Sequence, residues 1–93
     1  MTKKRRENLN PMLAIALQHE LGKSKVPKVV ASGSGYAAQK IIDLAHENNI
    51  TVQKDEHLAT MLSDVEVNSF VPEDLYEAVA KVLAFIYRVE GKI

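Results

Sequence analysis

Residues 26–50 read VPKVVASGSGYAAQKIIDLAHENNI, and this stretch decides the fold. The adjacent β-branched residues within Lys28–Ala31 are typical of a strand. The following segment predicts a helix with Ser34 as its N-cap and an apolar stripe at helical spacing, formed by Ala37, Ile41, Leu44 and Ala45. Ile50–Gln53 then alternates apolar and polar residues, as a short strand does. A strand, a helix and a strand in this order predict a βαβ unit with parallel strands and a right-handed crossover.

The rest of the chain contains one ambiguous apolar run and two predicted helices. Met12–His19 suits either a buried strand or a helix, because periodicity cannot decide so short a run. Asp55 is a suitable N-cap for a short helix whose inward residues are Leu58, Met61 and Leu62. Pro72 suits the first turn of a closing helix, and Gly91 follows the end of that helix. The apolar stripe of the closing helix is formed by Leu75, Val79, Val82, Leu83 and Ile86.

The composition is that of one small domain with no global charge. The chain has 93 residues, and its 12 basic and 12 acidic side chains balance, so no overall field favours nucleic acid or anionic lipid. The absence of cysteine excludes a disulfide framework, a cysteine nucleophile and a cysteine-ligated zinc site. No apolar run reaches the ~20 residues that span a bilayer, and the N-terminus lacks the apolar core of a signal peptide.

The first eleven residues differ in character from the rest. They are polar and include four consecutive basic residues, Lys3–Arg6. We therefore predict a flexible basic tail over residues 1–11 and a folded domain over residues 12–93. The basic run has two interpretations: a solvated, solubilising end, or a contact for an acidic partner such as RNA or a membrane surface.

Four segments resemble, in order and without large gaps, the cytoplasmic domain of the FlhB/YscU family. This family is the substrate-specificity switch of flagellar and type III secretion export machines. Residues 26–50 are similar to a family segment, Ala-Pro-Lys-Val-Val-Ala-Lys-Gly, and to the helix after it, which closes on Glu-Asn-Asn. Residues 71–88 look like the closing helix of the family, residues 55–62 lie where the family has a short helix, and Ala14–His19 resembles a family strand. Similarity over residues 12–90 is far more specific than a short motif.

The resemblance implies a fold and an organisation. We expect an α/β domain in which a small sheet of three or four strands is surrounded by helices, with residues 12–19 forming a strand. The usual members of the family also have an N-terminal membrane domain, which has no counterpart in these 93 residues. The chain therefore looks like a stand-alone FlhB-like (FlhX-type) protein.

The self-cleavage motif of the family is degenerate in this chain. Family members cut between Asn and Pro of Asn-Pro-Thr-His, where the Asn side-chain amide attacks its own backbone carbonyl. Here Asn10-Pro11 is followed by Met and Leu, so the Thr and the His are missing. Aligning Ala14–Leu17 with the family strand puts Leu9 at the Asn position and Met12 at the His position. We therefore expect no catalytic site and no efficient self-cleavage, with residual Asn-Pro cleavage as the alternative.

The resemblance also implies a binding surface. In the family, an apolar patch beside the closing helix receives the N-terminal signal of export substrates, and the matching positions are Val26, Pro27, Ala80 and Leu83. Small or rigid residues there predict a shallow groove for an apolar anchor of an extended peptide. For Leu83 the alternative is ordinary packing between a helix and the sheet.

Other candidate chemistry is weaker. The Gly33–Gly35 turn between a strand and a helix could hold a phosphate, but it lacks a full nucleotide-binding pattern, so a tight turn is the favoured interpretation. His19, His46 and His57 do not have metal-ligand spacing. We expect no cofactor and no metal.

The expected function is protein recognition within an export machine. We expect a non-cleaving, cytoplasmic FlhB-like component, peripheral at the export apparatus, which binds export substrates or export-apparatus proteins. The second form of this hypothesis is that the chain substitutes for the cleaved C-terminal fragment by docking onto the membrane domain of full-length FlhB. We expect no nucleic-acid partner and no transmembrane segment. The alternatives are an Asn-Pro autocleaving enzyme and a basic-tailed adaptor for nucleic acid or lipid.

Overall fold

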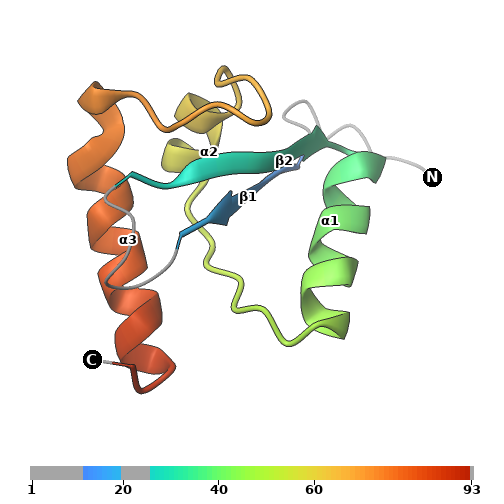
Figure 1. Ribbon diagram of the computed structural model, residues 1–93. Coiled ribbons are helices and arrows are strands. Elements are labelled where there is room, and N and C mark those ends of the chain that lie inside the picture. The colour runs from blue at the N-terminus through green and yellow to red at the C-terminus, as the bar shows by residue number, and fades with distance from the viewer. Residues whose placement is uncertain (1–11, 20–25, 93) are drawn as a thin grey trace.

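A computed structural model describes residues 12–19 and 26–92 of the chain (Figure 1). The predicted basic tail, including Lys3–Arg6 and the Asn10-Pro11 dipeptide, lies outside the described residues. The elements in chain order are strands β1 (Leu13–Gln18) and β2 (Lys28–Ser34), helices α1 (Tyr36–Glu47) and α2 (Glu56–Leu62), the 3-10 turn η2 (Glu73–Leu75) and helix α3 (Tyr76–Val89). The fold is thus the α/β arrangement that the resemblance implied.

The sheet in the described ranges has two strands rather than three or four. β1 and β2 are antiparallel, with Leu13 opposite Ser34 and Gln18 opposite Lys28. The strand predicted for residues 12–19 is therefore confirmed. The parallel βαβ pair is wrong, because Ile50–Gln53 forms no strand and pairs with neither β1 nor β2.

A different segment lies against the start of β2. The Val29 N–H donates to the Ser69 carbonyl at 2.9 Å, and the Asn68 N–H donates to the Val29 carbonyl at 2.6 Å. The Val71 N–H donates to the Pro27 carbonyl at 2.9 Å. Residues 68–71 therefore satisfy the outward backbone groups at this end of β2.

Helix α1 packs on the face of the sheet that has the smallest side chains. Successive strand residues point to opposite faces, so Ala14 and Ala16 share one face with their partners Gly33 and Ala31. A Cβ built on Gly33 would lie 2.8 Å from the Cβ of Ala37 on α1, so only glycine permits this close approach.

Two details of the α1 prediction are wrong. Ser34 belongs to β2 and caps nothing; the N-cap residue is Gly35, whose φ of 58° suits glycine. The predicted stripe is inward only in part: Ala37 and Ile41 lie against Gly33 of β2, whereas Leu44 is 56% exposed and Ala38, which was outside the stripe, is fully buried. The Ser34 error arises because the strand continues to Ser34, which leaves Gly35 at the cap position.

The apolar core lies on the other face of the sheet, under α2 and α3. It is a cluster of five buried residues: Val29, Leu58, Leu62, Val71 and Val79. Ile15 and Leu17 of β1 pack against this cluster. The Asp55 carboxylate accepts from the Leu58 N–H at 3.0 Å, so the predicted N-cap of α2 is confirmed.

Helix α3 ends as the sequence predicted. Gly91 has a φ of 77° and donates its N–H to the Arg88 carbonyl at 3.1 Å. The Lys92 N–H donates to the Tyr87 carbonyl at 2.8 Å. This pair of bonds is the Schellman arrangement, which satisfies carbonyls that the helix leaves unpaired and fixes the direction of the chain after α3.

Candidate functional site

The four residues predicted to form a binding surface lie before β2 and on α3. Val26 is half-buried, Pro27 is buried, Ala80 is exposed and Leu83 is half-buried. The Pro27 carbonyl accepts from Val71, which is a core residue, and Leu83 packs against the same core cluster. The structure thus buries Pro27 beside the core residue Val71 and packs Leu83 against the core cluster, while Ala80 is exposed.

Leu83 therefore has a packing role, whatever it binds. Its side chain contacts the cluster that includes Val79 and Val29, so it links α3 to the sheet. A charged substitution at Leu83 would place that charge against the core and weaken the fold. A binding role for the four residues stays a prediction, and Ala80 is the position at which it can be tested without disturbing the core.

Sequence reasoning missed an exposed aromatic residue beside this surface. Phe70 forms a bridge with Lys28, the first residue of β2, and its side chain is 60% exposed. The Lys28 Nζ lies 5.4 Å from the centroid of the Phe70 ring, which is a cation–π distance. The signal in the sequence was a lone Phe directly before Val71-Pro72.

The contacts of the Gly33–Gly35 turn lie within the sheet and under α1, and they favour a structural role over phosphate binding. The Gly35 N–H donates to the Met12 carbonyl at 2.8 Å, so this donor is already used. Gly33 lies in β2 under Ala37. Both observations favour the interpretation of a tight turn.

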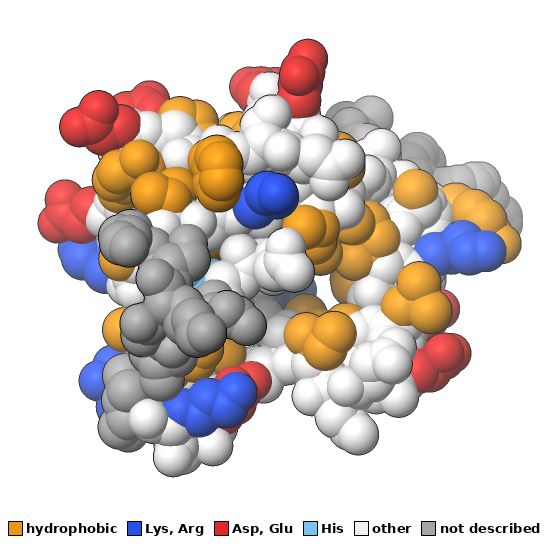
Figure 2. All heavy atoms as spheres, in the orientation of Figure 1, with side chains coloured by type: hydrophobic (Ala, Val, Ile, Leu, Met, Phe, Trp, Pro, Cys, Tyr) orange, Lys and Arg blue, Asp and Glu red, His pale blue; other side chains and the backbone are white. Residues whose placement is uncertain are grey.

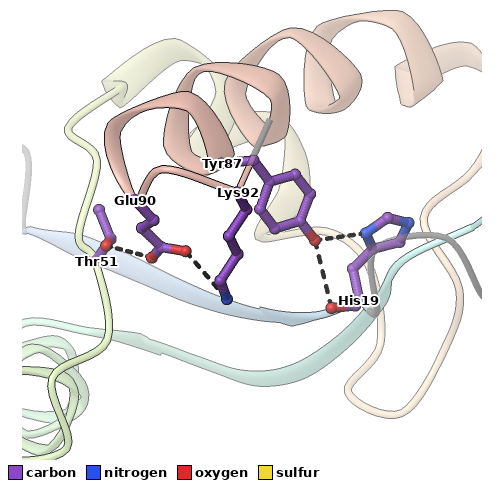
Figure 3. Close-up of polar contacts among 5 residues, drawn as sticks. All are labelled: His19, Thr51, Tyr87, Glu90 and Lys92. Carbon is purple, nitrogen blue, oxygen red and sulfur yellow. Dashed lines mark hydrogen bonds and ion pairs between the residues drawn. The ribbon is translucent and has the colours of Figure 1, made fainter.

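One polar contact joins the end of β1 to α3 (Figure 3). The Tyr87 hydroxyl lies 2.8 Å from His19 Nδ1 and donates to the His19 carbonyl oxygen at 3.4 Å. Both bonds are satisfied when the imidazole carries its proton on Nδ1. His19 is thus a structural residue that ties β1 to α3.

A second contact joins the connector after α1 to the end of α3 (Figure 3). The Thr51 hydroxyl donates to the Glu90 carboxylate at 2.5 Å, and the Lys92 ammonium lies 3.5 Å from the other Glu90 oxygen. The Thr51 hydrogen bond, and then the Lys92 charge, hold the pKa of Glu90 below its ordinary value. This contact fixes the connector at Thr51, next to Ile50 and Val52.

Residues 9–86 match the sequence profile described as the FlhB HrpN YscU SpaS family, so the chain belongs to this family. It is 35% identical over 80 residues to the uncharacterized protein YlqH of Bacillus subtilis (strain 168), covering 86% of each chain. It is also 35% identical over 81 residues to the flagellar biosynthetic protein FlhB of the same organism, covering 86% of this chain and 22% of that protein. The chain thus spans about a fifth of the length of its FlhB relatives.

Solved structures show the same fold. The cytoplasmic domain of FlhB from Shewanella putrefaciens superposes with a TM-score of 0.77 at 32% identity, over 84% of this chain and 64% of that chain. A mutated EscU/SpaS C-terminal domain gives 0.77 at 32% identity, over 83% and 96% of the two chains. The PscU C-terminal domain gives 0.75 at 29% identity, over 80% and 95%.

The described residues contain no helix that is both long and apolar enough to cross a membrane.

Proposed function

We propose that the chain is a non-catalytic binding component of the flagellar or type III export apparatus, located in the cytoplasm and peripheral to the membrane. It recognises export substrates, or it substitutes for the C-terminal fragment that FlhB relatives release on cleavage. The observation that carries this proposal is the structural match to the FlhB cytoplasmic domain over 84% of the chain.

The absence of catalysis is part of the proposal. The family reaction needs an Asn side chain that can attack its own carbonyl and polar neighbours that assist the attack. At the matching positions this chain has Leu9 and Met12, and neither has an amide or an imidazole. Recognition alone needs no cofactor.

The proposed recognition surface contains Val26, Pro27, Ala80 and Leu83. Ala80 supplies an exposed small side chain, so an apolar anchor can approach α3 closely at that point. Phe70 extends the apolar character of the region to the start of β2, where an exposed aromatic ring is a common anchor for a protein partner.

The test is a binding titration of the purified chain against N-terminal peptides of export substrates and against export-apparatus proteins. Ala80→Glu adds bulk and charge at the proposed surface without touching the core. Lys81→Glu is the matched control, because it places the same new side chain one residue along α3 at an exposed position. Saturable binding that is lost in Ala80→Glu and kept in Lys81→Glu supports the proposed recognition surface. Equal binding by both variants would contradict it.

A further inference from the structure

Two large apolar side chains in the connector between α2 and η2 are exposed. Val67 is 46% exposed and Phe70 is 60% exposed, whereas the next residue, Val71, is buried in the core. In the upper part of Figure 2, an apolar area with acidic side chains on both sides lies over this connector and η2, which Figure 1 shows in the same orientation. An exposed apolar area with a polar rim is typical of an interaction site.

The backbone that carries Val67 and Phe70 is fixed by hydrogen bonds. The Ser69 N–H donates to the Glu66 carbonyl at 3.0 Å and closes a tight turn around Val67 and Asn68. Asn68 has a φ of 76°, a conformation that asparagine tolerates in turns. Phe70 forms a bridge with the first residue of β2. Because this backbone is already ordered, a partner that packs on the two side chains loses little affinity to the ordering of the chain.

The charge around these two side chains is strongly negative. Residues 55–80 contain seven of the 12 acidic side chains and none of the 12 lysines and arginines of the chain. The seven are Asp55, Glu56, Asp64, Glu66, Glu73, Asp74 and Glu77. The chain as a whole is neutral, so this stretch produces a local negative potential that the net charge does not reveal.

Four exposed carboxylates flank the apolar pair in the sequence. They are Asp64 and Glu66 before Val67, and Glu73 and Asp74 after Phe70. Within residues 12–19 and 26–92, none of the four makes an ion pair. The Lys28 ammonium lies 5.4 Å from the centroid of the Phe70 ring and supplies one positive charge beside the four negative ones. We call Val67, Phe70 and the four carboxylates the acid-rimmed patch.

The charge of the rim decides the class of partner. Nucleic acids and anionic lipid surfaces carry charge of the same sign as the carboxylates, so the patch repels them. A second copy of the chain fits poorly, because a two-fold pairing would place the same acidic patch opposite itself. A protein segment with lysine or arginine beside an apolar side chain fits both parts, since its cations meet the rim and its apolar side chain meets Phe70.

We propose that the acid-rimmed patch binds a segment of another protein in which an apolar anchor is flanked by lysine or arginine residues. The anchor packs against Val67 and Phe70, and the flanking cations lie beside Glu66 and Glu73. This inference rests on the proposed function, because it names the charge that the chain selects in the segments it recognises. The chain's own Lys3–Arg6 run fits only the rim, since its four cations are consecutive and have no apolar residue among them.

The test uses three fluorescent peptides of equal length. The lysine peptide has a central pair of leucines with two lysines on each side, the glutamate peptide has glutamates in place of the lysines, and the serine peptide has serines in place of the leucines. We expect saturable binding of the lysine peptide, about tenfold tighter than that of the other two and weaker at higher salt. Equal binding of the serine peptide and the lysine peptide would overturn the proposal, because charge alone would then explain it.

Charge reversal tests where the lysine peptide binds. Glu66→Lys combined with Glu73→Lys reverses two charges of the rim. Asp43→Lys combined with Glu47→Lys is the matched control, because it makes the same change of net charge at two exposed positions of α1. We expect affinity for the lysine peptide to fall about tenfold in the first double variant and to stay within about twofold in the control. Equal losses in both would show that the peptide senses only net charge, which overturns the proposal.

Phe70→Ala tests the apolar centre of the patch. Tyr36→Ala is the matched control, because Tyr36 is also an exposed aromatic residue with a lysine ammonium 5.5 Å from its ring centroid. We expect only Phe70→Ala to weaken binding of the lysine peptide. NMR of the wild-type chain gives a readout that does not depend on the variants folding: the peptide should shift the amide signals of residues 64–74 and leave those of α1 unchanged. Shifts centred elsewhere overturn the proposal.

Further outcomes separate this inference from its alternatives and from the proposed function. If the lysine peptide binds only after Lys3–Arg6 are replaced by alanine, the chain's own basic run occupies the patch and the proposal is wrong. If the export-substrate and export-apparatus titration succeeds while the lysine peptide fails, the acid-rimmed patch is wrong and the proposed function stands. If the lysine peptide binds while that titration fails, the patch stands and the proposed function is wrong. Failure of both removes both.

Discussion

The Tyr87 hydroxyl on α3 lies 2.8 Å from His19 Nδ1, just after β1, across 68 positions of sequence. The two rings are tilted by 31° with centroids 6.0 Å apart, so the polar contact is accompanied by ring packing. This pair is a direct tie between the edge strand and the last helix, and its removal should be measurable.

Tyr87→Phe keeps the ring and deletes the hydroxyl. We expect the free energy of unfolding to fall by about 0.5–1.5 kcal/mol, because a part-buried hydrogen bond is lost. Urea denaturation measures this change. Tyr36→Phe is the control, because the Tyr36 side chain is 79% exposed and should change stability by less than about 0.5 kcal/mol. Equal effects at the two positions would contradict a structural role for the pair.

Thr51→Val should raise the pKa of Glu90 toward its ordinary value. The Thr51 hydrogen bond is the largest of the effects that lower this pKa, and it stabilises the charged carboxylate. A lowered folded-state pKa stabilises the fold above the unfolded-state pKa, and this contribution is lost as the pH falls through the folded-state value. The stability gap between wild type and Thr51→Val should therefore be full at neutral pH and shrink in acid.

NMR titration of the Glu90 side chain reads this pKa directly. Thr60→Val is a suitable control, because the Thr60 hydroxyl bonds to the Glu56 carbonyl within α2 and does not reach Glu90. A Glu90 pKa that is the same in wild type and Thr51→Val would show that the hydrogen bond does not form in solution.

Gly33→Ala should destabilise the domain by about 1–3 kcal/mol. The new Cβ would meet the Ala37 Cβ at 2.8 Å and the Ala37 carbonyl carbon at 3.1 Å, so α1 must shift from the sheet. Ser34→Ala, at the next position of β2, should be close to neutral because the Ser34 side chain is exposed and caps no helix. Thermal unfolding of the two variants distinguishes the stability that depends on the close approach at Gly33 from any stability due to an N-cap at Ser34, which the sequence suggested.

Purified protein stored at neutral pH should keep Asn10 joined to Pro11. The assisting Thr and His of the family motif are replaced by Met12 and its neighbour, so the succinimide reaction has no support. Intact-mass spectrometry over several weeks measures the outcome. A major species beginning at Pro11 would defeat the prediction.

Local patterns in the sequence predicted the features that depend on a few neighbouring residues. Asp55 is an N-cap because its carboxylate reaches an N–H three residues on, and Gly91 ends α3 because the turn needs a positive φ. Neither feature requires knowledge of the distant chain. The inward residues Leu58 and Leu62 followed from the same local spacing.

Features that depend on distant partners were not predictable in the same way. Ile50–Gln53 has the alternation of a strand, but it pairs with neither β1 nor β2, and residues 68–71 lie against the start of β2 instead. The run from Met12 to His19 was ambiguous from its residues, and the family resemblance resolved it correctly. In α1, Ala37 and Ile41 of the predicted stripe lie against Gly33, but Leu44 is exposed and Ala38 is buried in its place, a difference that helical spacing alone did not predict.

The predicted binding residues also combine a feature that the sequence could predict with one that depends on distant parts of the chain. The sequence and the resemblance located Val26, Pro27, Ala80 and Leu83, but they could not separate exposed from inward side chains. That distinction depends on how α3 lies against the core, where Leu83 packs and Ala80 does not.

The core has a consequence for synthesis on the ribosome. It joins Val29 of β2 to Val79 of α3, so its members are separated by up to fifty positions in the chain. A nascent chain that has exposed only β1, β2 and α1 has no partner yet for the apolar face of Ile15, Leu17 and Val29. The domain can close its core only after α3 has left the exit tunnel, and until then this apolar face is open to unintended association. The emergence of α3 from the ribosome therefore ends the period in which the apolar face of the sheet is exposed.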